Sequence, residues 1–177
     1  QLDRAIPQHH QFIEDIQLTA YLDHPQIVRT LPLEFYEDLT VIPMEFVHGQ
    51  ELSGKIAEGK SPVETVHKIA LHAAEALRTA HHVGLIHGRM TSNNLLLTHE
   101  GDLKILEFGF ASLPEELLFN DTEDMPHLNL PSPPRRPPLS RYAYLAPEQV
   151  NGSRPEGSSD LFALGVILYE LLIGEFL

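Results

Sequence analysis

The chain has 177 residues, enough for one sizeable domain or two small lobes, and its hydrophobic fraction of 42% is typical of a folded globule. Lys and Arg number 12 against 25 Asp and Glu, so the formal net charge is −13. Nucleic acids and anionic membranes need basic surfaces, and neither is an expected partner. The absence of cysteine excludes disulfides and thiolate chemistry, and fits a cytoplasmic location.

The first predicted element is a helix over residues 9–25. Apolar Phe12, Ile13 and Ile16 recur at helical spacing until Pro25 stops the pattern. Two strands are predicted next, over residues 31–35 and 39–46. The second contains Pro43, which favours an edge or an end of a sheet.

A capped helix is predicted to begin at the sequence SPVE. Ser61 is the expected N-cap, Pro62 the first helical residue and Glu64 the partner that closes a capping box. The helical pattern then runs to Gly84. Two short strands are predicted after it, around the turn HEGD at residues 99–102.

The last third of the chain begins with a long proline-rich loop, predicted over residues 119–140. Its stretch 131–138 has P-x-x-P spacing, which is either a ligand for an SH3-type domain or, as we favour, an extended loop. A helix is predicted over 158–174. It is apolar nearly all round, so we expect it to be buried, and it is too short to span a membrane.

Six stretches occur in an order that resembles protein kinase domains, closest to bacterial Ser/Thr kinase-like domains. They resemble the end of helix C, the hinge, the catalytic loop H-R-D-x-x-x-x-N, the D-F-G motif, the A-P-E motif and helix F. In that order the stretches are LDHPQIV (22–28), IPMEFVHGQEL (42–52), LIHGRMTSNNLLL (85–97), KILEFGFA (104–111), YLAPEQV (144–150) and SDLFALGVILYELL (159–172).

The resemblance implies an α+β fold with the two lobes of a kinase. Residues 1–47 would form part of the N-lobe, with helix C and strands 4 and 5, together with the hinge. Residues 48–177 would form a mainly helical C-lobe that runs through helix F. No G-x-G-x-x-G precedes the first helix, nor does any lysine, so we expect a domain truncated at both ends.

The same resemblance marks the positions of the phosphoryl-transfer residues, and several are substituted. A kinase positions a hydroxyl with one aspartate and holds Mg²⁺ through a second aspartate and an asparagine. Arg89 stands at the catalytic aspartate position, Thr91 at the loop lysine, Asn94 at the metal-binding asparagine and Glu107 at the metal-binding aspartate. Guanidinium cannot accept a proton, and the longer Glu107 fits octahedral Mg²⁺ poorly.

Further positions follow from the hinge and from the ends of the motifs. Asp15 stands at the helix C acid, and Arg141 replaces the threonine that family members carry before A-P-E. The expected nucleotide contacts are Met44, Glu45, Phe46, Val47, Leu96 and Glu107. Since the metal-binding aspartate is replaced by Glu107 and the catalytic aspartate by Arg89, we expect weak binding of ATP and Mg²⁺ and a function that requires neither.

The leading hypothesis is a pseudokinase that binds a protein partner and acts in regulation. The alternative is an ATP-dependent Ser/Thr protein kinase with unusual motifs that uses Glu107 for its metal. A third hypothesis is a regulator that senses ATP without hydrolysing it. Since Arg89 and Glu107 would face the same metal site, we also expect them to form an ion pair.

Overall fold

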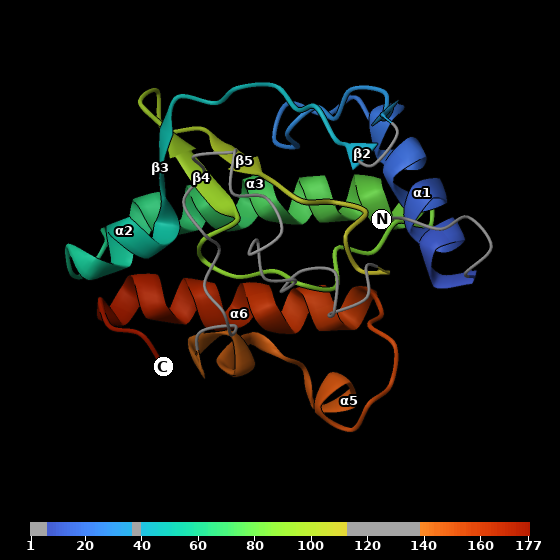
Figure 1. The fold of residues 1–177 in the computed structure, drawn as a ribbon. Helices are drawn as coiled ribbons and strands as arrows, with labels where there is room; N and C mark the ends of the chain where they lie inside the picture. The colour runs from blue at the N-terminus through green and yellow to red at the C-terminus, as the bar shows by residue number, and fades with distance from the viewer. Residues whose placement is uncertain (1–6, 37–39, 113–138) are drawn as a thin grey trace, which may run out of the picture.

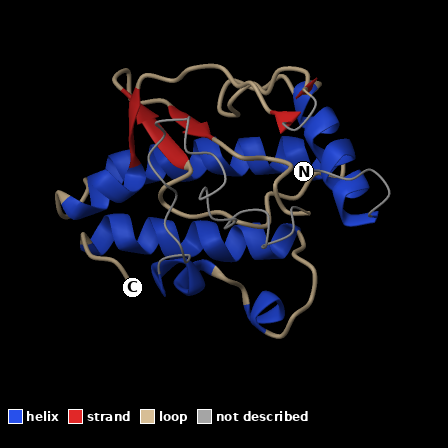
Figure 2. Ribbon diagram, viewed as in Figure 1, coloured by secondary structure: helices blue, strands red, loops and turns tan. Residues whose placement is uncertain are grey.

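The fold is α+β, with one small sheet and two long helices arranged in layers. The computed structural model describes residues 7–36, 40–112 and 139–177 (Figure 1). Helix α3 (Val63–His82) lies in the middle, with the sheet on one side and helix α6 (Gly157–Ile173) on the other (Figures 1 and 2). The sheet is antiparallel and has the order β3 (Gly49–Glu51), β4 (Leu95–Thr98), β5 (Leu103–Ile105).

Shorter elements surround these layers. Helix α1 (Pro7–Ala20) lies at one end of the molecule, beside the two-stranded pair β1 (Glu34–Phe35) and β2 (Thr40–Val41). Helix α2 (Leu52–Ala57) directly follows β3. The 3-10 helix η2 (Leu139–Tyr144) packs on α6, and the short helix α5 (Pro147–Val150) follows it on the side of α6 away from α3.

The main core lies between the sheet, α3 and α6. The inward face of α3 repeats at helical spacing through Ile69, Ala73 and Leu77, all of which are fully buried. Small alanines on this face let the neighbouring backbone approach closely. The face packs in one cluster with residues such as Leu103 from the sheet and Ile167 from α6. A second, smaller core forms around Phe12 and Ile16 of α1.

The predicted helices and the β4–β5 hairpin are confirmed, except that the first helix ends at Ala20 and not near Pro25. The strands predicted over 31–35 and 39–46 are mostly wrong, because only β1 and β2, of two residues each, form there. Beyond β2, only an isolated bridge from Met44 to Thr30 continues the pairing. Pro43 has no N–H to donate to a ladder, although its carbonyl accepts a hydrogen bond from Leu31 N at 2.8 Å. Pairing with residues 29–31 continues just past the proline, where Glu45 N donates to Arg29 O at 2.9 Å, and the chain then runs on through the predicted hinge to β3.

The predicted capping box at the start of α3 is wrong. The N-cap is Pro62, without a side-chain hydrogen bond. Ser61 is buried, its hydroxyl has no hydrogen-bond partner, and its backbone N–H donates to Leu171 O at 2.8 Å. Docking against the last turns of α6 therefore decides the backbone geometry here, and it turns the hydroxyl away from the helix end.

Helix α6 is buried on one face only, so the prediction of a helix buried all round is wrong in part. Ala163, Ile167 and Leu171 are buried against the core, whereas four large apolar side chains are 41% to 55% exposed: Leu161, Phe162, Tyr169 and Leu172. The apolar composition of α6 therefore exceeds what its neighbours in this chain cover.

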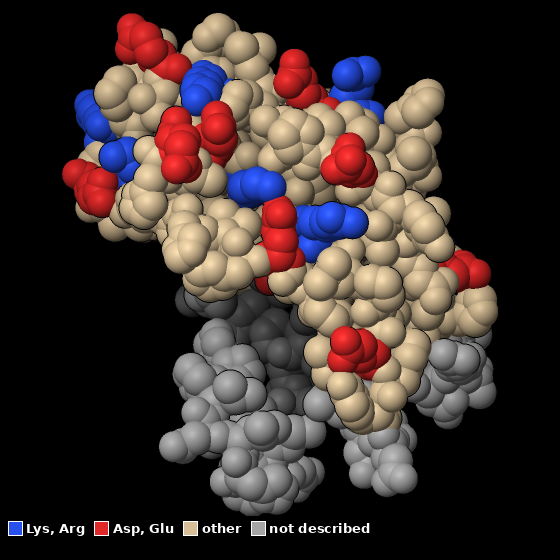
Figure 3. Space-filling model, turned by 90° about the horizontal axis from the view of Figure 1, so that it is seen from above, with Lys and Arg blue, Asp and Glu red and all other residues tan. Residues whose placement is uncertain are grey.

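No helix among the described residues is long and apolar enough to cross a membrane. On the face shown in Figure 3, the described basic and acidic side chains are interspersed rather than gathered by sign. That face therefore presents mixed charge rather than one broad negative field.

Candidate functional site

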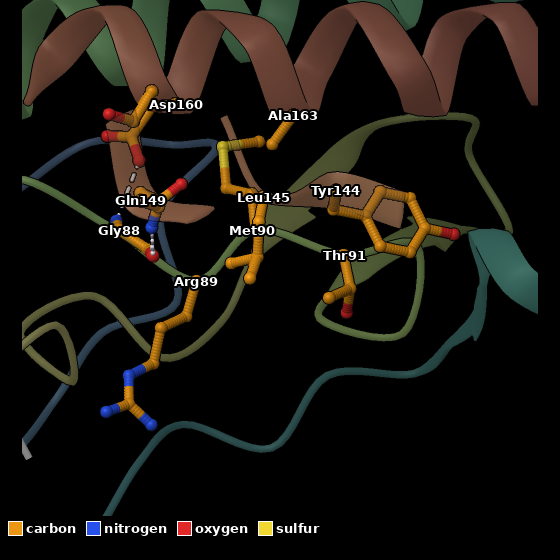
Figure 4. A pocket seen from close by; sticks show the side chains of 10 residues that line it. Gly88, Arg89, Met90, Thr91, Tyr144, Leu145, Gln149, Asp160 and Ala163 are labelled. Carbon is orange, nitrogen blue, oxygen red and sulfur yellow. Dashed lines mark hydrogen bonds between the residues drawn. The ribbon is translucent and has the colours of Figure 1, made fainter. Parts of the chain in front are cut away.

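Asp160 anchors the loop that follows α3. It lies in the first turn of α6, is 1% exposed, and accepts hydrogen bonds from His87 N at 2.9 Å and Gly88 N at 2.7 Å. His81 Nε2, near the end of α3, lies 2.8 Å from the same carboxylate. One buried carboxylate therefore holds the loop between the two long helices (Figure 4).

His87 joins this loop to the strand that leads into the segment Glu107–Phe108–Gly109. Its Nε2 lies 2.9 Å from the carbonyl of Leu106 and must be the donor, because a carbonyl only accepts. The ring packs at 4.9 Å against Phe108. Complete burial lowers the pKa of His87, against the raising effects of Asp160 and Glu107. The imidazole is therefore a neutral structural link.

Gly88 occupies a position that admits no side chain. Its φ of 69° lies in the left-handed region, and an added Cβ would stand 2.8 Å from Pro155 Cγ and 2.9 Å from Ala111 Cβ. Its carbonyl accepts a hydrogen bond from Gln149 Nε2 at 2.8 Å, as Figure 4 shows. The close packing of this loop thus depends on glycine.

Asn94 organises the rest of the loop from a buried position. Its Oδ1 accepts from Thr91 N at 2.8 Å, and its Nδ2 donates to Arg89 O at 3.0 Å and to Glu107 Oε2 at 3.3 Å. The Thr91 N–H can only donate, which fixes the orientation of the amide. The structure therefore brings Asn94 and Glu107 together, but the Asn94 oxygen already has a hydrogen-bond partner and the amide nitrogen faces Glu107.

The expected ion pair between Arg89 and Glu107 is wrong. Among the described residues, no ion pair joins them: the Glu107 carboxylate accepts from Asn94 instead. The Arg89 side chain extends away from α6 and Asp160 in Figure 4. The short Asn94 side chain, which the loop backbone holds in place, makes the hydrogen bond to the Glu107 carboxylate that Arg89 was expected to make. Glu107 also has a φ of 63°, a conformation that costs a non-glycine residue about 1–2 kcal/mol.

The hinge positions lie on the segment between β2 and β3. Phe46 is 83% exposed, Met44 is exposed, and Val47 is half-buried, while Leu96 belongs to β4. Glu45 forms an ion pair with Lys104 of β5, with 2.6 Å between Oε1 and Nζ. Burial raises the pKa of Glu45, but hydrogen bonds from Lys104 and from the backbone of Arg29 outweigh burial and lower it overall. The ion pair therefore ties the hinge to the sheet.

A buried polar network under the loop was missed from the sequence. Tyr144 donates its hydroxyl to Glu170 Oε2 at 2.7 Å, so Ser92, at 3.0 Å from that hydroxyl, must donate to it in turn. Glu170 also accepts from Leu177 N at 3.0 Å. Burial raises the pKa of Tyr144 and keeps the donor protonated. The signal was available, because Glu170 is the one acid in the otherwise apolar stretch 161–173 of α6.

A small pocket opens beside the loop, between the turn before α5 and helix α6 (Figure 4). Its lining residues are Gly88, Arg89, Met90, Thr91, Tyr144, Leu145, Gln149, Ser159, Asp160 and Ala163. Within the described ranges, no three His, Asp or Glu side chains gather closely enough to hold a metal ion. Asp160 is the one carboxylate in this lining, and both of its oxygens already accept hydrogen bonds from the loop backbone.

A model of the protein kinase domain matches residues 2–177. The chain belongs to the protein kinase domain family. It is 32% identical over 165 residues to a probable serine/threonine-protein kinase of Clostridium perfringens and 30% identical over 166 residues to the serine/threonine-protein kinase PrkC of Bacillus subtilis. A tyrosine-protein kinase of Myxococcus xanthus, MasK, is 32% identical over 174 residues.

These alignments cover 91% to 93% of the chain but only 22% to 25% of the relatives. The kinase fold inferred from the motifs is thus confirmed. The division at residue 47 and the assignments of Arg89 and Thr91 to catalytic positions stay predictions. Arg141 lies in η2, but its side chain is not among those that the structure describes. The loop predicted over residues 119–140 also lies outside the described residues up to residue 138.

Proposed function

We propose that this kinase domain acts as a regulatory module in the cytoplasm, that it binds a protein partner, and that it transfers little or no phosphate. The observation that carries the proposal is the position of Arg89. Two hydrogen bonds hold the loop around it: Gly88 N donates to the Asp160 carboxylate, and Asn94 Nδ2 donates to the carbonyl of Arg89. The motif order assigns Arg89 to the catalytic aspartate position, and a guanidinium there cannot accept the proton of a substrate.

The metal positions support the same proposal. Mg²⁺ needs oxygen ligands in near-ideal octahedral geometry. The Asn94 oxygen is bonded to Thr91 N, and the Asn94 amide nitrogen, not its oxygen, points at Glu107. Both side chains would have to rearrange to present oxygens to one ion. We therefore expect weak binding of Mg²⁺ and ATP, and a partner-binding role that requires neither.

Phosphate transfer from γ-labelled ATP to a generic protein substrate, by the full-length protein, tests the proposal. We expect no transfer above a buffer control, because a positioned base contributes about 10²–10⁴-fold and a cation replaces it here. Arg89→Asp alone should not restore transfer, since Thr91 and Glu107 remain. Arg154→Asp, at an exposed arginine, is the matched charge control. Transfer above the buffer control would overturn the proposal.

The second candidate is an active Ser/Thr protein kinase with an unusual metal site. It is favoured by the 3.3 Å contact that brings Asn94 and Glu107 together, and by the kinase names of the relatives. In that case transfer would occur, and Glu107→Ala would abolish it. A domain that senses ATP without hydrolysing it would instead bind nucleotide and show no transfer.

A further inference from the structure

Asp15, the acid on α1, has both of its carboxylate oxygens occupied by groups of this chain. Gln11 Nε2 donates to Oδ1 at 2.9 Å from one helical turn earlier. The hydroxyl of Ser112 donates to Oδ2 from a position 97 residues later in the chain. A carboxylate that accepts two hydrogen bonds is well satisfied without a cation.

The segment that carries Ser112 lies directly along α1. At Gly109, whose φ is 86°, an added Cβ would stand 2.9 Å from Thr19 Oγ1 and 3.1 Å from the carbonyl oxygen of Asp15. Next to it, the ring of Phe110 meets that of Phe12 edge to face, with centroids 5.5 Å apart. Backbone contact, ring contact and hydrogen bond thus fix this segment on the helix at three successive points.

We propose that the Asp15–Ser112 contact is a charge-sensitive latch that docks α1 onto residues 107–112. The Ser112 hydroxyl is a neutral donor to a carboxylate, so removing it leaves a half-buried oxygen without that donor. A negative group at residue 112 would stand against Asp15 in a partly desolvated place and repel it. The latch concerns the position of α1 and holds whether or not phosphate is transferred.

Hydrogen exchange on the full-length protein, with and without Mg–ATP, tests the latch through the amides of residues 12–20. We expect Ser112→Ala to speed their exchange about tenfold, the effect of one hydrogen bond to a charged group. Ser112→Glu should speed it further. Ser153→Ala and Ser153→Glu, at an exposed serine, are matched controls and should leave α1 unchanged. Mg–ATP should leave exchange in α1 within about twofold.

Two results would overturn the latch. One is equal exchange in α1 for Ser112→Glu and Ser153→Glu. The other is equal acceleration in α1 and α6 for Ser112→Glu, which would mean general destabilisation. A third measurement keeps the proposal testable if one variant folds poorly. In an Asp15→Ala background, Ser112→Ala should change exchange by less than about twofold. An undiminished tenfold effect there would show that Ser112 acts through another residue.

Discussion

Single buried polar residues hold the loop of this kinase domain in place. Asp160, Asn94 and His87 are each at least 93% buried. Asp160 and Asn94 accept hydrogen bonds from backbone N–H groups of the loop, and His87 donates to the carbonyl of Leu106. A buried polar group is costly to leave unpaired, so such residues define one arrangement much more sharply than apolar contacts do. These residues therefore fix the backbone of the loop around Arg89.

The buried His87 should make stability depend on pH. Burial lowers its pKa below 6.5 in the folded state, so below that pH the unfolded chain binds a proton that the fold excludes. The stabilisation is therefore complete above pH 6.5 and is lost as pH falls toward the lowered pKa. Urea unfolding between about pH 7.5 and about pH 5.5 should show a loss of up to about 1.4 kcal/mol per pH unit from this group.

The variant His87→Gln isolates this contribution. Its amide can still donate toward Leu106 O but does not titrate, so the fall in unfolding free energy at low pH should become shallower. His82→Gln, at an exposed histidine, should keep the original slope. Burial also lowers the pKa of His24, and the contribution of His24 to the pH dependence of stability remains in both variants. An unchanged slope in His87→Gln would contradict the prediction.

At the scale of elements, the end of α6 determines how the start of α3 is docked. Gly174 caps α6 with a φ of 73°, and its N–H donates to Glu170 O at 2.7 Å. An added Cβ would stand 2.3 Å from Lys60 N and 2.5 Å from Gly59 C. The segment before α3 therefore passes directly over the C-terminus of α6, in the region where Ser61 bonds to Leu171.

Gly174→Ala should accordingly destabilise the protein more than Gly84→Ala does. Both glycines have a backbone in the left-handed region, and each substitution costs about 1–2 kcal/mol because alanine disfavours that conformation. An added Cβ at Gly84 meets nothing within 4 Å, whereas the one at Gly174 meets backbone, which should cost about 1–3 kcal/mol more. Free energies of unfolding from urea titrations measure the difference. Equal losses would mean that the segment around Lys60 can move aside.

At the scale of the whole molecule, nucleotide should add little to stability. A ligand present at its dissociation constant stabilises the folded state by about 0.4 kcal/mol, and we expect about 5 mM Mg–ATP to do no more. Thermal unfolding of the full-length protein with Mg–ATP, with ATP and a chelator, and with buffer measures this. The reason is that Asn94, the predicted metal ligand, uses its side-chain oxygen to accept a hydrogen bond from Thr91 N.

A rise of several degrees would contradict this expectation, and its dependence on metal identifies what binds. If the rise needs Mg²⁺ and disappears in Glu107→Ala, the active-kinase alternative gains support. If it persists with the chelator, the domain binds ATP without metal and the sensor hypothesis gains support. His99→Ala, at an exposed residue on the β4–β5 turn, is a control that should change neither result.

The sequence by itself determined the long elements and the family. Apolar spacing within one element predicts α1, α3 and the β4–β5 hairpin, because a helix or a hairpin is decided by residues a few positions apart. The order of six motifs then identified the kinase fold, and glycine marked the end of α3. The substitutions assigned to Arg89, Thr91 and Glu107 stay predictions, since they rest only on a comparison of residue types.

Only the tertiary structure decided which polar groups meet. Ser112 reaches Asp15 across 97 residues and Tyr144 lies 52 residues after Ser92, distances at which no local pattern applies. The same reason explains why the predicted ion pair between Arg89 and Glu107 and the predicted capping box at Ser61 were wrong. Asn94 bonds the Glu107 carboxylate, and Ser61 follows the backbone contact with α6 rather than its own helix. Such pairings depend on the packing of distant segments, because each buried polar group bonds whichever partner the folded chain brings within reach.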